Sequence, residues 1–201
     1  RLYLQPLSCL IINFTMRKLK LQVQITIDGF ISGPNGEMDW LTFNWSPDLN
    51  EYVTQLTDPV DTILLGRNLA EGFIPHWTNA LNNAEPEPGA DKMVNTPKVV
   101  FTKTLEKSVW ENTVLAKGDL VKEINALKQK PGGDMIVYGG GKFVSSLIKE
   151  KLIDELHLFI NPAVIGNGMT IFASLTEKQI YQLLNVKSFD CGIVVLTYKT
   201  I

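Results

Sequence analysis

The stretch Asp134-Met-Ile-Val-Tyr-Gly-Gly-Gly-Lys-Phe-Val-Ser-Ser-Leu-Ile-Lys-Glu150 carries the clearest structural signal in the chain. It begins with a short apolar run at residues 135–138, which is typical of a buried strand. Three glycines follow at once, and the apolar residues after them recur at helical spacing. The stretch therefore predicts a strand, a glycine turn and an amphipathic helix in direct succession.

The predicted glycine turn suits an anionic ligand. Gly139, Gly140 and Gly141 allow positive φ angles and let another group come close to the backbone. The start of the helix, at Lys142 and Phe143, leaves unpaired N–H groups at the positive end of the helix dipole, where phosphate binds well. A tight turn without a ligand is the alternative. The spacing matches neither the P-loop nor the GxGxxG dinucleotide fingerprint, so a nucleotide site here would be of another kind.

Length and composition are those of one globular α/β domain. The chain has 201 residues, of which 45% are hydrophobic and 20% are charged, and this is enough for a proper core. A net charge of −2 gives no basic surplus for nucleic acid, and no apolar run approaches the length of a membrane span. We therefore expect neither nucleic acid nor a membrane as a partner. Cys9 and Cys191 cannot form a disulfide framework or a cysteine-type zinc site; they fit a reduced, cytoplasmic compartment.

Residues 1–15 differ from the rest of the chain. They contain no acidic residue, and they include a short apolar patch at positions 9–14. Met16 and the basic segment after it, in contrast, resemble a natural start of a chain. We expect 1–15 to be an extension outside the fold and 16–201 to form a single domain. A poor export signal is the alternative, although the small-residue cleavage site of such a signal is missing.

The remaining chain alternates between strand and helix patterns. Strands are predicted at residues 18–27, 62–65, 98–101, 113–116, 135–138 and 155–160, and helices begin after Ser46, Gly66, Asp119 and Gly141. Two further strands, at 181–189 and 193–198, form a closing hairpin. This order predicts an α/β fold whose mostly parallel sheet has helices on both faces and an antiparallel hairpin at one edge.

Two segments are interpreted from composition and pattern alone. Residues 75–97 are polar and rich in Asn, Pro and Glu, and we expect a long mobile loop there, because such loops are functional or disordered in compact domains. His157 lies among alternating apolar residues, which favours a histidine of the core or sheet surface over a catalytic one.

Polar groups follow three predicted strands at their C-terminal ends. Gly66, Arg67 and Asn68 follow the second strand, Thr102-Lys103-Thr104 follows the third, and the glycine turn follows the fifth. Because ligands collect at the C-terminal edge of such sheets, these groups together suggest one extended ligand with several negative charges. A phosphorylated dinucleotide is the natural candidate, and ordinary surface salt bridges are the alternative.

In order and spacing, seven segments resemble the dihydrofolate reductase-like superfamily, specifically its stand-alone branch related to the reductase domain of the riboflavin-biosynthesis deaminase-reductase. The segments are Ile25-Thr-Ile-Asp-Gly-Phe-Ile-Ser-Gly, Asp39-Trp, Thr62-Ile-Leu-Leu-Gly-Arg, Val99-Val-Phe-Thr-Lys, Ile136-Val-Tyr-Gly-Gly-Gly, Leu152-Ile-Asp-Glu-Leu-His-Leu and Pro162-Ala-Val-Ile-Gly-Asn-Gly. The resemblance runs from Met16 to the end. It implies a three-layer fold, a homodimer, and NADPH-dependent hydride transfer to a C=N or C=O group of a pyrimidine-like or pterin-like small molecule.

The resemblance also implies roles for individual residues. The pyrophosphate of the cofactor would be held by Gly139, Gly140, Gly141, Lys142 and Phe143, and its phosphates would be approached by Gly66, Arg67 and Asn68. Its adenosine 2′-phosphate would be held by Thr102 and Lys103. Its nicotinamide carboxamide would be held by Gln24 and Ile31. The loop at 32–40, with Asp39 and Trp40, would close the substrate cleft; a plain surface loop is its alternative. Asp28, Asp39 and Glu51 are candidate proton donors, with Asp28 first because it abuts the end of the first strand.

Three departures from the family pattern keep other functions open. Glu51 only approximates the carboxylate position of folate reductases, and Phe30 stands where riboflavin reductases usually carry a basic residue. The zinc deaminase motif of the bifunctional enzyme is missing, so we expect only its reductase half in this sequence. Dihydrofolate reductase activity and a nucleotide-binding module without turnover are the alternatives. Hydrolysis ranks below them, because the sequence has neither a Gly-x-Ser-x-Gly motif nor a metal-ligand cluster.

Overall fold

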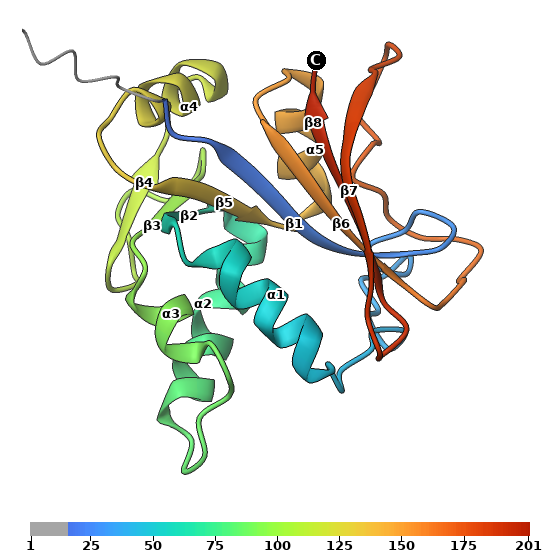
Figure 1. Cartoon of the computed structure of the whole chain (residues 1–201). Helices are drawn as coiled ribbons and strands as arrows, with labels where there is room; N and C mark the ends of the chain where they lie inside the picture. Colours follow the sequence, from blue (N-terminus) through green and yellow to red (C-terminus); the bar gives the residue numbers. More distant parts are fainter. Residues whose placement is uncertain (1–15) are drawn as a thin grey trace, which may run out of the picture.

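The computed structural model describes residues 16–201 (Figure 1). The strands are β1 (Leu19–Thr26), β2 (Val60–Gly66), β3 (Lys98–Phe101), β4 (Thr113–Ala116), β5 (Asp134–Tyr138), β6 (Glu155–Asn161), β7 (Tyr181–Ser188) and β8 (Val194–Thr200). The helices are α1 (Pro47–Thr57), α2 (Arg67–Asn82), α3 (Ala90–Asn95), α4 (Leu120–Lys128) and α5 (Gly141–Lys149). The extension or export signal expected at 1–15 lies outside the described residues. Within them, no helix is long and apolar enough to cross a membrane.

All the strands form one eight-stranded sheet in the order β4-β3-β2-β5-β1-β6-β8-β7. The strands from β4 to β6 in that order are parallel, whereas β8 runs antiparallel to β6 and β7 antiparallel to β8. The predicted fold class, a mostly parallel sheet with an antiparallel hairpin at one edge, is confirmed. β1 lies inside the sheet, hydrogen-bonded to β5 on one side and β6 on the other.

Helices cover both faces of the sheet, as the alternating pattern predicted. One core contains the odd-numbered residues of β1, such as Leu21 and Val23, and packs against α4 and α5. On the opposite face, α2 and α3 cover β2 and β3, while α1 packs over Phe159 of β6. β1 turns only polar side chains to this second face, because its residues alternate between the two sides: they are Lys20, Gln22, Gln24 and Thr26.

The prediction of a long mobile loop at residues 75–97 is wrong. The short helix expected after Gly66 instead continues through Pro75 to Asn82, and α3 follows at Ala90–Asn95. The buried side of α2 extends past the proline, with Ile74 and Ala80 in the core, and Phe73 stacks on Tyr138 at 5.4 Å between ring centroids. This packing outweighs a mid-helix proline, which costs about 3 kcal/mol. A local composition rule does not include such tertiary contacts.

Candidate functional site

Two helices begin side by side at the C-terminal edge of the sheet. α2 follows β2 and α5 follows β5, and these two strands are hydrogen-bonded parallel neighbours. The N-caps, Gly66 and Gly140, provide no side-chain acceptor, and neither helix has an acidic residue in its first turn. The unpaired N–H groups of two helix ends, each with a positive dipole end, are therefore directed to one region. Such an arrangement binds phosphate groups.

The glycine turn before α5 leaves open space next to its backbone. Gly139 and Gly140 have φ angles of 32° and 83°, in the region that favours glycine. A Cβ atom at Gly139 would meet nothing within 4 Å, and one at Gly140 would meet only Leu69, at 3.6 Å. Beside the turn, Ile31 lies close enough that a Cβ atom at Gly141 would be 3.5 Å from its Cδ1. The residues present thus fit a pyrophosphate held by backbone N–H groups.

Gly66 and Phe143 serve the packing of α5 against β2. A Cβ atom at Gly66 would lie 2.8 Å from the Cβ of Phe143, and the Phe143 ring lies 4.9 Å from that of Phe101. Glycine at position 66 is thus required for α5 to approach β2. The partly buried ring of Phe143 packs against the core, and its backbone N–H, in the unpaired first turn of α5, is free to contact a ligand.

Arg67 connects the start of α2 to the end of β3. Its Nη1 donates to Thr104 Oγ1 at 2.6 Å, and its Nε donates to Glu71 at 2.8 Å. Asn68, next along α2, is exposed. The structure therefore brings together two of the strand ends that the sequence singled out. Thr104 was not among the assigned cofactor residues, although its position in the polar group after the third strand was a usable signal.

The end of β3 carries two of the assigned residues, and both have structural partners. Thr102 is buried, and its Oγ1 accepts hydrogen bonds from the N–H groups of Thr104 and Leu105 at 3.2 and 3.1 Å. Lys103 Nζ donates to the carbonyl oxygens of Lys117 and Gly118 at 2.8 and 2.6 Å. An ammonium group has three N–H donors, so Lys103 keeps one for an anion.

The end of β1 is tied to the loop before α1 through Asn161, which sequence reasoning missed. Asn161 is fully buried; its Nδ2 donates to Gln24 Oε1 at 2.8 Å, and its Oδ1 accepts from the backbone N–H of Thr42 at 3.0 Å. In the same loop, the buried indole N–H of Trp40 has no hydrogen-bond partner. On β1, the buried Oε1 of Gln22 has none either. These groups are a donor and an acceptor that a polar ligand could satisfy.

The three candidate acids are not brought together. Asp28 accepts hydrogen bonds from the Thr26 hydroxyl at 2.6 Å and from the N–H groups of Gly166 and Ile165 at 2.7 and 3.2 Å. The Thr26 hydroxyl, followed by these backbone donors, lowers the pKa of Asp28 despite some desolvation. A carboxylate held in its charged form is a poor proton donor. Asp39 is exposed, and Glu51 is exposed on α1, where it accepts from Gln55.

Next to α1, a buried polar group surrounds His157. The ring is 6% exposed; its Nδ1 lies 3.3 Å from the Tyr52 hydroxyl and 3.4 Å from Thr197 Oγ1, and its Nε2 lies 3.5 Å from Glu155. The neighbouring His157 ring, together with Lys18 at 2.7 Å, lowers the pKa of Glu155 to about 2. The prediction of a sheet histidine is confirmed. No group of His, Cys, Asp and Glu suited to a metal ion occurs among residues 16–201.

Residues 17–195 match the family described as the RibD C-terminal domain. The chain belongs to this family. The resemblance inferred from the seven sequence segments is thereby confirmed.

Relatives of the RibD C-terminal family agree with this membership. The chain is 31% identical to Bacillus subtilis YyaP, a protein described as uncharacterized, over 92% of this chain and 96% of YyaP. It is 26% identical to the Aquifex aeolicus riboflavin biosynthesis protein RibD, over 81% of this chain and 51% of that protein.

Among solved structures, the Thermotoga maritima diaminohydroxyphosphoribosylaminopyrimidine deaminase/5-amino-6-(5-phosphoribosylamino)uracil reductase gives a TM-score of 0.66 at 18% identity. The match covers 92% of this chain and 57% of the Thermotoga chain. A pyrimidine reductase-like protein from Corynebacterium diphtheriae gives 0.60 at 15% identity, over 92% of both chains. At these identities the likeness concerns the fold.

Proposed function

We propose that this protein is an NADPH-dependent reductase that transfers a hydride to a C=N or C=O group of a pyrimidine-like or pterin-like small molecule. The proposed reaction resembles that of 5-amino-6-(5-phosphoribosylamino)uracil reductase, an activity named for one of the structural neighbours. The observation that carries the proposal is the pair of uncapped helix starts, at Arg67 and Gly141, on adjacent strands. Family membership supports the reductase part of the proposal.

The bound cofactor would supply the hydride, and the residues of the chain bind and orient it. Gly139, Gly140 and the first N–H groups of α5 fit the pyrophosphate. Arg67 lies where a guanidinium can reach a phosphate while Thr104 holds it in place. Lys103, at the end of β3, is the candidate for the 2′-phosphate, which distinguishes NADPH from NADH.

The substrate would lie between β1 and α1. The unpaired acceptor of Gln22 and the unpaired donor of Trp40 suit a ring that carries both an N–H and a C=O group. Dihydrofolate is not the substrate we propose, because the side chain of Glu51 contacts solvent and Gln55 on α1. Proton donation by Asp28 stays a prediction; its contacts support a role in holding the loop at residues 162–168.

The first experiment is a titration of the purified protein with NADPH and, separately, NADH, followed by tryptophan fluorescence and calorimetry. We expect Arg67→Gln to weaken the binding of both nucleotides about tenfold, as the loss of one charged phosphate contact of ~1.4 kcal/mol predicts. Lys103→Gln should weaken NADPH and leave NADH unchanged. Lys122→Gln, an exposed lysine on α4, is the control. Absence of binding at millimolar concentration for both nucleotides would refute the proposal.

A nucleotide-binding module without turnover is the second candidate, and the separation of Asp28, Asp39 and Glu51 favours it. The two candidates differ in one readout. A reductase oxidises NADPH when it is supplied with a pteridine, pyrimidine or quinone acceptor, whereas the module binds NADPH and leaves it unchanged with every acceptor. A cytoplasmic location belongs to the main proposal, because Cys191 is a free thiol.

A further inference from the structure

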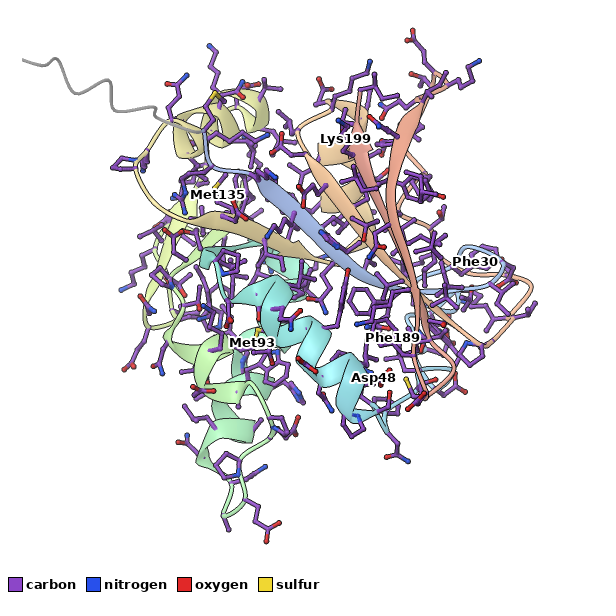
Figure 2. The ribbon with its side chains drawn as sticks, viewed as in Figure 1. Phe30, Asp48, Met93, Met135, Phe189 and Lys199 are labelled. Atoms are coloured by element: carbon purple, nitrogen blue, oxygen red, sulfur yellow. The ribbon has the colours of Figure 1, made fainter. Side chains whose placement is uncertain are left out.

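A cavity of about 420 Å³ lies between α2, α3 and the segment that leads into β4. Figure 1 shows α2 and α3 side by side next to this end of the sheet. The volume is within the range of small-molecule sites, which is about 300–1,000 Å³. Met93 of α3, labelled in Figure 2, is buried in the core and forms part of the inner wall. The exposed lining residues Thr78 and Val109 mark the side that opens to solvent.

A buried positive charge belongs to the lining of this cavity. Lys98, the first residue of β3, is 3% exposed. Its Nζ donates to the carbonyl oxygens of Val94 and Thr96, both at 2.8 Å. An ammonium group has three N–H donors, so Lys98 keeps one donor for a ligand. Burial lowers the pKa of Lys98, and no neighbouring carboxylate opposes that effect.

Lys98 differs from the other buried lysine and arginine residues of the described chain, because each of those pairs with a carboxylate. The pairs are Arg17 with Asp61, Lys20 with Asp134 and Lys128 with Asp154. Among residues 16–201, Lys98 has no such partner, although buried charges in proteins are normally paired. A negatively charged group in the cavity would complete the environment of Lys98.

Two indole rings line the same cavity and are fixed by their neighbours. Trp77 of α2 makes edge-to-face contacts with Phe73 and His76, at 6.1 and 5.1 Å between ring centroids. The backbone of Trp110 is held by the Ser108 hydroxyl, which accepts from its N–H at 3.2 Å and donates to its carbonyl oxygen at 2.9 Å. Rigid indole walls favour an aromatic ring as the apolar part of a ligand.

The groups around Lys98 limit the ligand to a single negative charge. The carbonyl oxygens of Val94 and Thr96 already place partial negative charge beside Nζ. The exposed carboxylate of Glu111 also lines the cavity and would repel a dianion. A phosphate dianion therefore fits poorly, whereas a carboxylate group can accept the remaining N–H of Lys98 in a charge-assisted hydrogen bond.

We propose that this cavity binds a small aromatic carboxylate, with its ring against Trp77 and Trp110 and its carboxylate on Lys98 Nζ. Lys98 lies at the N-terminal end of β3, whereas Lys103 follows the C-terminal end. Because four residues of strand span about 13 Å, the ligand would occupy a place separate from the cofactor region. The proposal does not depend on the proposed reductase activity.

The test compares three ligands that share one ring system and differ in charge: 2-naphthoate, 2-naphthamide and 2-naphthylmethylamine. Binding to the purified protein is measured by calorimetry and by saturation-transfer NMR. We expect 2-naphthoate to bind about tenfold more tightly than the amide, as one hydrogen bond between charged groups predicts. The amine, which carries a positive charge like Lys98, should bind more weakly than the amide.

Two substitutions test the charges of the cavity separately. Lys98→Met should remove the preference for 2-naphthoate and leave the affinity for the amide unchanged. Lys122→Met, at an exposed position on α4, is the matched control and should keep the preference. Glu111→Gln should tighten the binding of 2-naphthoate about two- to fivefold, because it removes a repelling charge at the solvent-exposed side.

Thr78→Trp covers the case in which Lys98→Met fails to fold. An indole at this exposed position on α2 fills the mouth of the cavity and leaves the hydrogen bonds of Lys98 intact. Binding of 2-naphthoate should be lost, with the circular dichroism of wild type. The proposal is wrong if 2-naphthoate and the amide bind equally, if neither binds at millimolar concentration, or if Lys98→Met or Thr78→Trp binds 2-naphthoate like wild type. Displacement of 2-naphthoate by NADPH would place it in the cofactor region and also overturn the proposal.

Discussion

Asn161 holds the loop before α1 against the end of β1 through side-chain hydrogen bonds to Gln24 and Thr42. Asn161→Leu keeps the volume and leaves both partly buried partners without these bonds. We expect it to lower the free energy of unfolding by about 2–4 kcal/mol, because each unpaired buried polar group costs about 1–3 kcal/mol. Urea denaturation measures the loss. Asn79→Leu, at an exposed position on α2, is the control. A change under about 0.5 kcal/mol in Asn161→Leu would contradict this reading.

Glu155 makes the stability of the protein depend on acid pH. Its folded-state pKa of about 2 lies below the ordinary value of 4.5, chiefly because of the neighbouring His157 ring. The carboxylate therefore stabilises the fold above pH 4.5, and this contribution is lost as the pH falls from there toward 2. Such a shift corresponds to roughly 3 kcal/mol at most.

The Glu155 contribution can be isolated with Glu155→Gln. We expect this variant to be less stable than wild type at pH 6, and the difference to shrink steadily when urea denaturation is repeated down to pH 2.5. The difference shrinks because protonation of Glu155 at low pH removes its charge from the wild-type protein, and the Gln variant lacks this charge at every pH. A difference in the free energy of unfolding that is independent of pH would contradict the shifted pKa.

At the scale of elements, Pro75 inside α2 makes a specific prediction. The proline removes one backbone hydrogen bond and crowds the carbonyl four residues earlier, so Pro75→Ala should raise the free energy of unfolding by about 1–3 kcal/mol. The gain stays below the full cost of a mid-helix proline, because alanine also raises the conformational entropy of the unfolded chain. Gly72→Ala in the same helix, where a Cβ atom has open space, gives a reference gain of about 1 kcal/mol. A decrease in the melting temperature of Pro75→Ala, with the expected gain in Gly72→Ala, would show that the proline ring contributes packing.

The same helix shows what the sequence could predict about elements. The strands and the starts of α1, α4 and α5 were predictable, because hydrophobic period, caps and glycines are local signals. The continuation of α2 past Pro75 was not, since it depends on contacts such as Phe73 on Tyr138. A local rule therefore ended the helix too early.

For the site, the sequence located the strand ends but not the partners of their side chains. The sequence predicted a glycine turn after β5 and polar groups after β2 and β3 at one edge of the sheet, and the structure shows that β2 and β5 are parallel neighbours. The need for glycine at 66 comes from Phe143, a contact between segments more than seventy residues apart. Asn161 and the contacts of Asp28 with the loop at 162–168 were missed for the same reason, because each joins the first strand to the far end of the sequence.

On the scale of the whole molecule, a ligand that spans the ends of β2, β3 and β5 should stabilise the entire fold. At a concentration of about 100 times its Kd, NADPH adds roughly 2.7 kcal/mol, which raises the Tm of a protein of this size by about 5–10 °C. Differential scanning fluorimetry measures the shift. It should decrease at high salt, because phosphate contacts are partly screened. Arg67→Gln provides the control, and a Tm unchanged by NADPH in wild type would contradict a site that connects these strands.

The position of β1 between β5 and β6 has a consequence for the synthesis of the protein. The first described strand has no neighbour until residue 134 has been made, and its second neighbour follows only at residue 155. At about 5–20 residues per second, a ribosome takes roughly 5–20 s to make the intervening chain. During that time Leu19, Leu21, Val23 and Ile25 have no sheet to enter. The nascent chain therefore presents an unpaired apolar strand, a target for chaperones, until most of the protein has been translated.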